Sequence, residues 1–334
     1  MTDALLSVRH LTTEFHLTDK QIARALEGVS FDAFPGQTVG LVGESGCGKT
    51  TTLMSIMRLL PANAHITSGN VFFKGKDLFT LSEPEMRTHR WKDMAIIFQG
   101  AMNALNPVMK IGNQVLEAIL LHNLMEHDAA KKRVGELLEM VGIPRTRRNQ
   151  YPHQYSGGMR QRAMIAMALA CSPELLFADE PTTALDVMIQ AQVLQLLKEI
   201  QKYLNLAIVL VTHDLGVVAE MCDSVVVMYG GKVAEYGSAE QVYNQPQHPY
   251  TQRLLESFPD LSRSADSAGK ELATIPGTPP RLNALPPGCR FSPRCYKSIE
   301  ACSQVAPPLV DMSETGTRHL AACHLLRGSE VKDL

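Results

Sequence analysis

One octapeptide constrains the fold of this 334-residue chain more than any other feature. Residues 43–50 read Gly-Glu-Ser-Gly-Cys-Gly-Lys-Thr and fit the phosphate-loop pattern G-x-x-x-x-G-K-[ST]. The loop follows a β-branched, apolar run from Thr38 to Val42 and precedes a helical pattern from Thr51 to Leu60. Because the motif requires this strand-loop-helix context, the pattern predicts an α/β fold that binds a nucleotide.

The residue types of this loop suit the binding of phosphate. Glycines let successive backbone N–H groups curl around phosphate oxygens, and the following helix presents its positive end. We expect Lys49 to reach the outer phosphates and Thr50 to ligate magnesium. Cys47 occupies a free position of the motif, so we expect no role for its thiol. The remaining nucleotide contacts are expected from Gly43, Ser45, Gly46, Cys47, Gly48 and Thr51.

A second apolar run, Leu175 to Ala178, ends on two carboxylates, Asp179 and Glu180. Ligands of open α/β sheets bind at the carboxyl ends of the strands. Asp179 suits the magnesium shell, and Glu180 suits orienting or deprotonating the attacking water. A third run, Ala207 to Thr212, is also followed by a helical pattern, which predicts strand-helix-strand units and a mainly parallel sheet. Together with the phosphate loop, the two carboxylates indicate a nucleoside triphosphatase.

Charge and hydropathy exclude several classes of protein. The 32 Lys and Arg residues nearly balance the 34 Asp and Glu residues, so no electrostatic footprint for nucleic acid is visible. The first ten residues lack the pattern of a secretory signal. The most apolar stretch, residues 163–171, is far shorter than the ~20 residues that cross a bilayer. We expect a cytosolic chain whose seven cysteines are thiols or metal ligands rather than disulfides.

The patterning along the chain changes three times. Alternation around Val8, Leu11 and Phe15, and again over residues 25–34, predicts an antiparallel sheet near the N-terminus. A helical period follows over residues 116–148. We expect residues 1–258 to form the nucleotide-binding domain, with a helical insertion at about 100–170, then a Pro-rich connector at 259–288 and a Cys-rich module at 289–326.

The segment Tyr155-Ser156-Gly157-Gly158-Met159 resembles the L-S-G-G-Q signature of the ABC ATPase family and departs from it at Tyr155 and Met159. The resemblance implies that Ser156, Gly157 and Gly158 bind the γ-phosphate of a nucleotide held by the opposite subunit. Because the Ser-Gly-Gly core is intact, we expect altered packing rather than lost phosphate binding. The alternative from the residues alone is a helix N-cap at Ser156 followed by a flexible glycine pair.

Other positions match the family in the expected order. Gln99 resembles the Q-loop glutamine that contacts magnesium and water, and Asp186 resembles the D-loop aspartate at the dimer interface. His213 resembles the switch histidine that contacts the γ-phosphate. Phe15 is the candidate for stacking on adenine, with a place in the sheet core as the alternative. The implied fold is an ABC-type P-loop ATPase with an antiparallel β subdomain, a mixed-sheet RecA-like core, a helical subdomain and a small Cys-rich C-terminal extension.

The C-terminal part narrows the resemblance. Three segments, residues 247–251, 275–280 and 288–295, resemble the C-terminal extension of ATPase subunits of oligopeptide and dipeptide importers, and the likeness covers nearly all of residues 5–326. It implies an ATP-hydrolysing subunit, on the cytoplasmic face of the inner membrane, that pairs with a second homologous ATPase. The two would drive peptide uptake through two permease subunits fed by an external solute-binding protein. Nickel complexes, short sugars and antimicrobial peptides stay open as alternative solutes.

Two other functions stay as alternatives to an importer motor. A soluble ABC ATPase acting on ribosomes or DNA usually has two ATPase halves or a long coiled coil, and this chain has one set of motifs. An inert regulatory subunit usually lacks the catalytic glutamate or the switch histidine, and here Glu180 and His213 are both present.

Four cysteines gather near the C-terminus, at Cys289, Cys295, Cys302 and Cys323. The segment is too short for a large core of its own, so we expect the four thiols to bind one cofactor that folds it. Their spacing differs from the C-x₂-C pairs of structural zinc sites. A [4Fe-4S] cluster is therefore expected, in line with the importer resemblance. Zinc, with His319 or His324 as a further ligand, and unliganded thiols are the alternatives.

Overall fold

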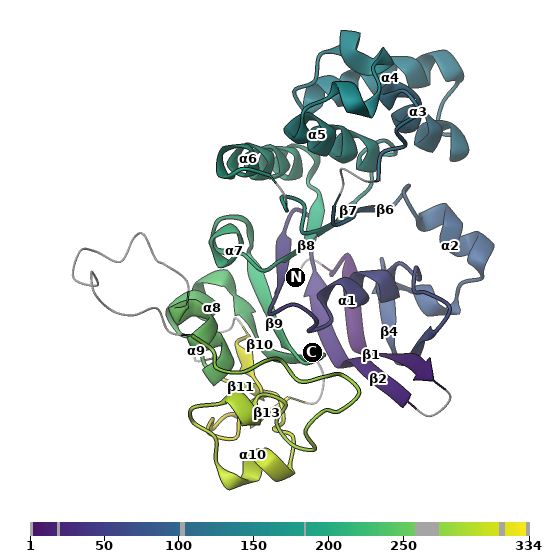
Figure 1. Cartoon of the computed structure of the whole chain (residues 1–334). Helices are drawn as coiled ribbons and strands as arrows, with labels where there is room; N and C mark the ends of the chain where they lie inside the picture. Colours follow the sequence, from purple (N-terminus) through teal and green to yellow (C-terminus); the bar gives the residue numbers. More distant parts are fainter. Residues whose placement is uncertain are drawn as a thin grey trace, which may run out of the picture. The chain divides into compact units, whose positions relative to one another are not determined.

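The computed structural model describes residues 3–18, 21–100, 104–183, 185–257, 274–313 and 318–331. The chain forms two compact units, whose elements can be followed in Figure 1. Unit 1 consists of Met1–Leu5, Ala33–Thr38 and Phe73–Val211, and unit 2 of Leu6–Asp32, Val39–Phe72 and Thr212–Leu334. Each unit is therefore assembled from several separate stretches of the sequence.

Three strands of unit 1 pair in parallel. Strand β7 (Leu175–Asp179) pairs with β6 (Met94–Ile97) on one side and with β8 (Ala207–Thr212) on the other. All residues of β7 and β8 are buried, which explains their unbroken apolar sequences, because parallel strands are covered on both faces. The predicted strand ending in two carboxylates is present.

The helices of unit 1 include those expected from the helical period of residues 116–148. Helix α3 (Ile111–Leu121) packs against α4 (His127–Met140), and both contact α5 (Gly157–Ala168). Leu137 and Leu138 of α4 are fully buried, and the chain leaves the helix at Gly142 with a left-handed φ of 75°. The other elements of unit 1 are β5 (Lys76–Asp77), α2 (Glu83–His89), α6 (Val187–Leu204) and the 3₁₀ turns Leu78–Thr80, Arg145–Asn149 and Pro152–Gln154.

Unit 2 contains the predicted antiparallel sheet, in which β1 (Leu6–Thr18) lies between β2 (Gln21–Ala33) and β4 (Ala64–Phe73). Helix α1 (Lys49–Ile56) contacts this sheet through a buried hydrogen bond of 2.9 Å between the hydroxyls of Thr13 and Ser55. Its other helices are α7 (Leu215–Met221), α8 (Ala239–Asn244), α9 (Pro249–Glu256) and α10 (Glu300–Gln304).

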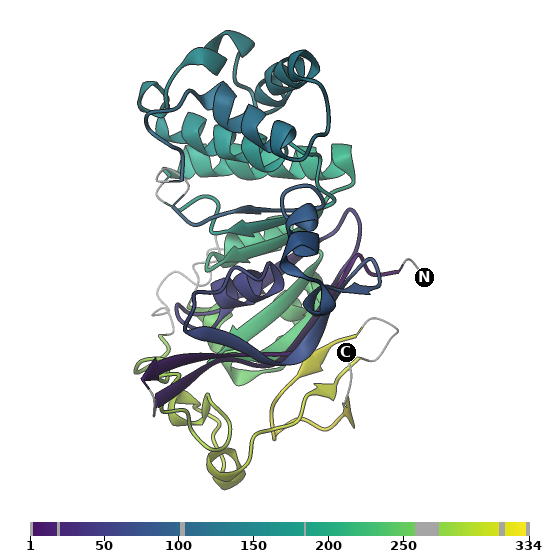
Figure 2. The same cartoon turned by 90° about the vertical axis from the view of Figure 1, so that its right-hand side faces the viewer.

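The remaining strands of unit 2 pair in both directions. Strand β3 (Thr38–Val42) pairs in parallel with β9 (Ser224–Tyr229), and β9 pairs antiparallel with β10 (Lys232–Ser238). The C-terminal strands continue the antiparallel pairing: β12 (Leu320–Ala321) pairs with β10, β11 (Val310–Asp311) with β12, and β13 (Ser329–Glu330) with β11. These last strands are coloured yellow-green to yellow in Figure 2.

The expectation of a separate Cys-rich module is not supported. We call residues 274–313 and 318–331 the C-terminal segment. It joins the core of unit 2 by strand pairing, with Leu320 opposite Tyr236, and by burial of Phe291 against Tyr229 and Tyr250 at ring distances of 5.2 and 5.4 Å. The C-terminal segment is too short to bury a large core by itself, and it buries its apolar side chains against the rest of unit 2 instead. The boundary expected at residue 258 and half of the expected connector lie outside the described residues.

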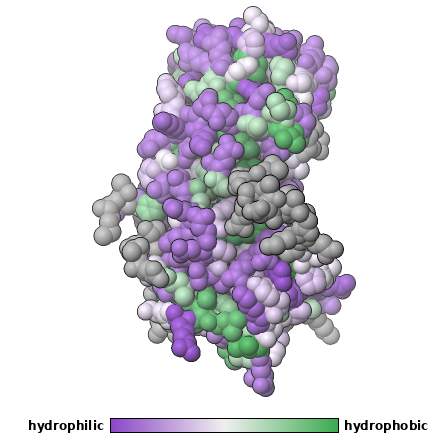
Figure 3. Space-filling view, turned by 90° about the vertical axis from the view of Figure 1, so that its left-hand side faces the viewer, coloured by the Kyte–Doolittle hydropathy of each residue, from purple (hydrophilic) through white to green (hydrophobic). Residues whose placement is uncertain are grey.

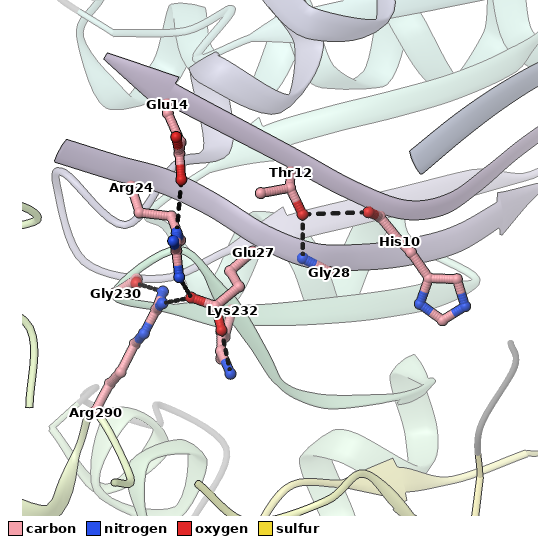
Figure 4. A network of polar contacts seen from close by, with 9 residues as sticks. All are labelled: His10, Thr12, Glu14, Arg24, Glu27, Gly28, Gly230, Lys232 and Arg290. Carbon is pink, nitrogen blue, oxygen red and sulfur yellow. Dashed lines mark hydrogen bonds and ion pairs between the residues drawn. The ribbon is translucent and has the colours of Figure 1, made fainter. Parts of the chain in front are cut away.

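Charged side chains add to this attachment, as Figure 4 shows. The guanidinium of Arg290 donates to the carboxylate of Glu27 on β2 and to the carbonyl oxygen of Gly230. Lys232 lies 2.8 Å from the same carboxylate, and Arg24 donates to it at 3.2 Å. The C-terminal segment is therefore tied to both sheets of unit 2.

Candidate nucleotide-binding site

The phosphate loop lies in unit 2 between β3 and α1, as predicted. The ammonium group of Lys49 is held back along the loop, donating to the carbonyl oxygens of Gly43 at 2.6 Å and Glu44 at 3.1 Å. Its third contact is the sulfur of Cys47, at 3.8 Å. Lys49 is only 7% exposed. Because all three of its partners are neutral, none of them offsets its charge, which is available to an anion that enters the loop.

Two glycines of the loop are required by its geometry. Gly43 has a φ of 147° and Gly48 a φ of 106°. A Cβ atom would lie 2.2 Å from the carbonyl oxygen of Met228 at Gly43, and 2.7 Å from that of Ala25 at Gly48. Gly48 is also the N-cap of α1 and supplies no side-chain cap, so the first N–H groups of this helix can receive an anion.

The other loop residues divide by exposure. Ser45, Gly46 and Thr50 are exposed and Thr51 is half-buried, whereas Cys47 is buried. Burial raises the pKa of the Cys47 thiol, so it stays protonated and unreactive. Only the backbone of Cys47 is therefore available to phosphate.

Phe15 lies near the end of β1 and is half-buried. Because side chains alternate along a strand, Phe15 shares a face with Thr13, whose hydroxyl contacts α1. The ring therefore lies on the face of the sheet that carries the phosphate-loop helix, and its partial exposure leaves surface for stacking. Its role toward adenine stays a prediction.

The two carboxylates lie in unit 1 at the end of β7. Asp179 is only 2% exposed, and Glu180 is half-buried with a left-handed φ of 45°. The amide of Gln99 donates to Oε2 of Glu180 at 2.8 Å, and the hydroxyl of Thr183 donates to the same oxygen at 2.9 Å. The structure thus brings Gln99 and Glu180 together. The left-handed backbone conformation of Glu180 is one that residues other than glycine rarely adopt, and such conformations are common at functional positions.

The signature segment begins α5. Ser156 is its N-cap, and its hydroxyl accepts the N–H of Met159 at 3.3 Å, so the capping alternative is correct for this side chain. Tyr155 is buried and donates to the carbonyl oxygen of Arg147 at 3.1 Å, while the sulfur of Met159 accepts from the Arg147 guanidinium at 3.5 Å. Both departures from the family pattern therefore have packing roles. The N–H groups of Gly157 and Gly158 lie at a helix N-terminus, where an anion is favoured.

Of the two remaining motif residues, Asp186 lies at the start of a helix and His213 at the end of a strand. Asp186 caps α6, its carboxylate accepting the N–H of Ile189 at 3.0 Å. It ends the segment Thr183-Ala184-Leu185-Asp186 that resembles the D-loop, in which Ala184 lies outside the described residues. His213 is exposed directly after β8. Gln99, Ser156, Gly157, Gly158, Asp179, Glu180 and Asp186 thus belong to unit 1, and Phe15, the phosphate loop and His213 to unit 2.

One loop residue, Glu44, and two of its partners, Tyr250 and Arg294, were not among the predicted site residues. Glu44 accepts a bidentate ion pair from Arg294, and its backbone N–H donates to the hydroxyl of Tyr250 at 2.9 Å. Tyr250 and Arg294 both fall in the segments that carried the resemblance to the importer extension. Contacts across 206 and 250 positions give no periodic signal in one sequence.

The expected cofactor site at the four C-terminal cysteines is not supported. Burial raises the pKa of Cys289, Cys295 and Cys323, and the nearby cysteine sulfurs raise it further, so the thiols share one neighbourhood. Among the described residues, however, no group of three or more His, Cys, Asp or Glu side chains is arranged to hold a metal ion. Neither the [4Fe-4S] cluster nor zinc is therefore supported.

The two histidines considered as further ligands have other partners. His319 contacts the buried carboxylate of Glu235 at 2.8 Å, and His324 contacts the carbonyl oxygen of Val305 at 2.8 Å. These contacts explain both side chains without a metal.

No helix within the described ranges has the length and hydropathy to cross a bilayer. The face drawn in Figure 3 is largely hydrophilic, with smaller hydrophobic groups between the polar residues.

Comparison with known proteins gives a consistent result over the whole chain. Residues 26–183 match the ABC transporter family, and residues 234–302 match the family described as "Oligopeptide/dipeptide transporter, C-terminal region". The chain is 51% identical to the dipeptide transport ATP-binding protein DppD of Bacillus subtilis (strain 168), over 99% of this chain and 100% of that protein. It is 46% identical to the oligopeptide transport ATP-binding protein OppD of Escherichia coli (strain K12), over 93% and 91% respectively.

Solved structures agree with the fold. The dimeric structure of the bacterial ABC transporter cassette MJ0796 matches with a TM-score of 0.63 and 28% identity, over 70% of this chain and 98% of that one. A dimeric post-hydrolysis state of the same cassette, bound to ADP and Pi, matches with a TM-score of 0.62.

Proposed function

Because this chain belongs to the ATP-binding subunits of the oligopeptide and dipeptide ABC transporters, we propose that it hydrolyses ATP to energise the uptake of di- or oligopeptides. The observation that carries this function is the near full-length likeness to a dipeptide transport ATP-binding protein, which includes the C-terminal region. The phosphate loop and the carboxylates after β7 support the ATPase activity.

In the proposed reaction the protein positions groups and neutralises charge, since phosphoryl transfer needs little covalent chemistry from an enzyme. Lys49 contacts the outer phosphates with the charge that its neutral partners leave available. Thr50, Gln99 and Asp179 would hold magnesium, which offsets phosphate charge when bound. Phe15 stacks on adenine, and the loop residues from Gly43 to Thr51 supply the remaining contacts.

Glu180 orients the attacking water and accepts its proton. This role is supported by the two hydrogen bonds from Gln99 and Thr183, which fix the carboxylate in one direction. His213 contacts the γ-phosphate. Ser156, Gly157 and Gly158 act on the nucleotide of the opposite subunit, with Asp186 at the interface between the subunits.

The proposed assembly contains a second homologous ATPase, two permease subunits and an external solute-binding protein, with this chain on the cytoplasmic side of the membrane. It is supported by the dimeric form of the similar ABC cassettes. Since the signature segment serves the other subunit's nucleotide, an isolated monomer binds ATP but hydrolyses it slowly.

The assignment is tested by Glu180→Gln in the full chain, assembled with its partner subunits in liposomes. We expect turnover to fall about 10²- to 10⁴-fold while the ATP dissociation constant stays within about twofold, because the amide cannot accept a proton. Glu174→Gln is the matched control, since Glu174 precedes the same strand and forms an exposed ion pair with Lys74. Full-speed hydrolysis by the Glu180→Gln transporter would refute the role. Stimulation by nickel complexes or short sugars, but not by peptides, would refute the solute.

A further inference from the structure

The C-terminal segment contacts the phosphate loop through one ion pair. Arg294, in the 3₁₀ turn Ser292–Arg294, places its two terminal nitrogens 2.6 and 3.0 Å from the two carboxylate oxygens of Glu44. The Arg294 side chain is only 6% exposed and that of Glu44 is 26% exposed. Glu44 is the second residue of the loop, next to Gly43. A planar two-point contact of this kind fixes direction as well as distance.

Arg294 is itself held from several sides. Its Nε donates to the carbonyl oxygen of Pro276 at 2.8 Å, and its terminal nitrogens contact the hydroxyl of Tyr229 at 3.1 Å and the carbonyl oxygen of Gly277 at 3.3 Å. The guanidinium therefore has little freedom to follow Glu44 if the loop moves. It acts as a fixed support rather than as a mobile surface charge.

The backbone of Glu44 is held as well. Its N–H donates to the hydroxyl of Tyr250, which is fully buried between Tyr229 and Phe291, at ring distances of 4.7 and 5.4 Å. Phe291 belongs to the C-terminal segment, so the support for the backbone of Glu44 also depends on that segment. Two contacts, one to the side chain and one to the backbone of Glu44, thus define the conformation at the start of the loop.

We propose that Arg294 is a positioning residue for ATP binding, whose ion pair with Glu44 holds the phosphate loop in its binding conformation. The C-terminal segment then sets the ATP affinity of the loop without contacting the nucleotide. A loop that is already ordered binds its ligand more tightly, because binding then loses less conformational entropy. Arg294 also neutralises a carboxylate that would otherwise repel the phosphates. This inference rests on the proposed function, in which the loop binds ATP.

The test measures ATP affinity of the full chain by titration calorimetry, and ATPase activity of the assembled transporter. We expect Arg294→Ala to raise the ATP dissociation constant and the KM for ATP about tenfold, with kcat at saturating ATP within about twofold. Arg294→Lys, which keeps the charge but loses the planar contact, should give an intermediate value and decides the matter if the Ala variant does not fold. In a Glu44→Gln background, Arg294→Ala should change the dissociation constant less than about twofold.

Gln252→Ala is the matched control. Gln252 accepts hydrogen bonds from Tyr296 and Lys297, so its loss loosens the C-terminal segment at α9 without touching Glu44. We expect wild-type ATP affinity for this variant. An unchanged affinity in Arg294→Ala and Arg294→Lys, while Lys49→Ala binds ATP weakly, would overturn the inference and leave the proposed function intact. If Lys49→Ala also binds ATP normally, the proposed function itself fails. Equal weakening by Gln252→Ala would reduce Arg294 to a general structural role and overturn the inference.

Discussion

Acidification should destabilise unit 2 through one buried histidine. His248 is only 3% exposed, its ring Nδ1 accepts the N–H of Tyr250 at 3.0 Å, and its backbone N–H donates to the carboxylate of Glu235 at 2.9 Å. Burial lowers its pKa from the usual 6.5 to about 4, against the opposing effect of the Glu235 charge. The unfolded chain therefore takes up a proton below pH 6.5, whereas the folded chain does so only near pH 4. Stability is complete above the first value and falls between the two.

The full difference of about 2.5 pKa units corresponds to ~3 kcal/mol, and about 2 kcal/mol of it is lost between pH 7.5 and pH 5. We would measure urea unfolding of the wild type and of His248→Asn at both values. Asparagine can accept the same N–H and caps helices well, but it does not titrate. The wild type should lose ~2 kcal/mol more than the variant on acidification. Equal losses would refute the reasoning, since Glu235 and His319 are common to both proteins.

Three further predictions concern the site. Lys49→Ala should weaken ATP binding on the order of 10- to 100-fold, because a charged donor is lost; titration giving an unchanged dissociation constant would contradict this. Gly43→Ala should abolish ATP binding and lower the melting temperature, since its Cβ would lie 2.2 Å from the carbonyl oxygen of Met228; normal binding would show that the loop tolerates a side chain. Tyr155→Phe should cost about 1 kcal/mol in urea unfolding through the lost bond to Arg147, with ATP affinity unchanged; weakened ATP binding would instead connect Tyr155 to the nucleotide.

Much of the nucleotide site could be predicted because its requirements are local. The phosphate loop and the two carboxylates at the end of β7 could be identified from short stretches of sequence. The capping by Ser156, which stood as the alternative for that residue, is equally local. These features needed no knowledge of distant contacts.

The C-terminal segment could not be predicted in the same way. Four clustered cysteines in a segment with little apolar sequence of its own suggested a cofactor, and the structure does not support that expectation. Its stability instead comes from partners elsewhere in unit 2: Phe291 packs on Tyr229, and His319 contacts Glu235. Neither contact has a periodic signature, so no pattern in the sequence indicated this source of stability.

The pairing of β12 with β10 bears on how the protein is made. A ribosome completes β10 at Ser238, but its partner strand begins only at Leu320. At about 5 to 20 residues per second, the ~80 intervening residues take on the order of 4 to 16 s to synthesise. Throughout that interval one edge of β10 lacks its native neighbour and can pair with a foreign strand. The growing chain therefore passes through an interval of exposure to aggregation that ends only when β12 has been synthesised.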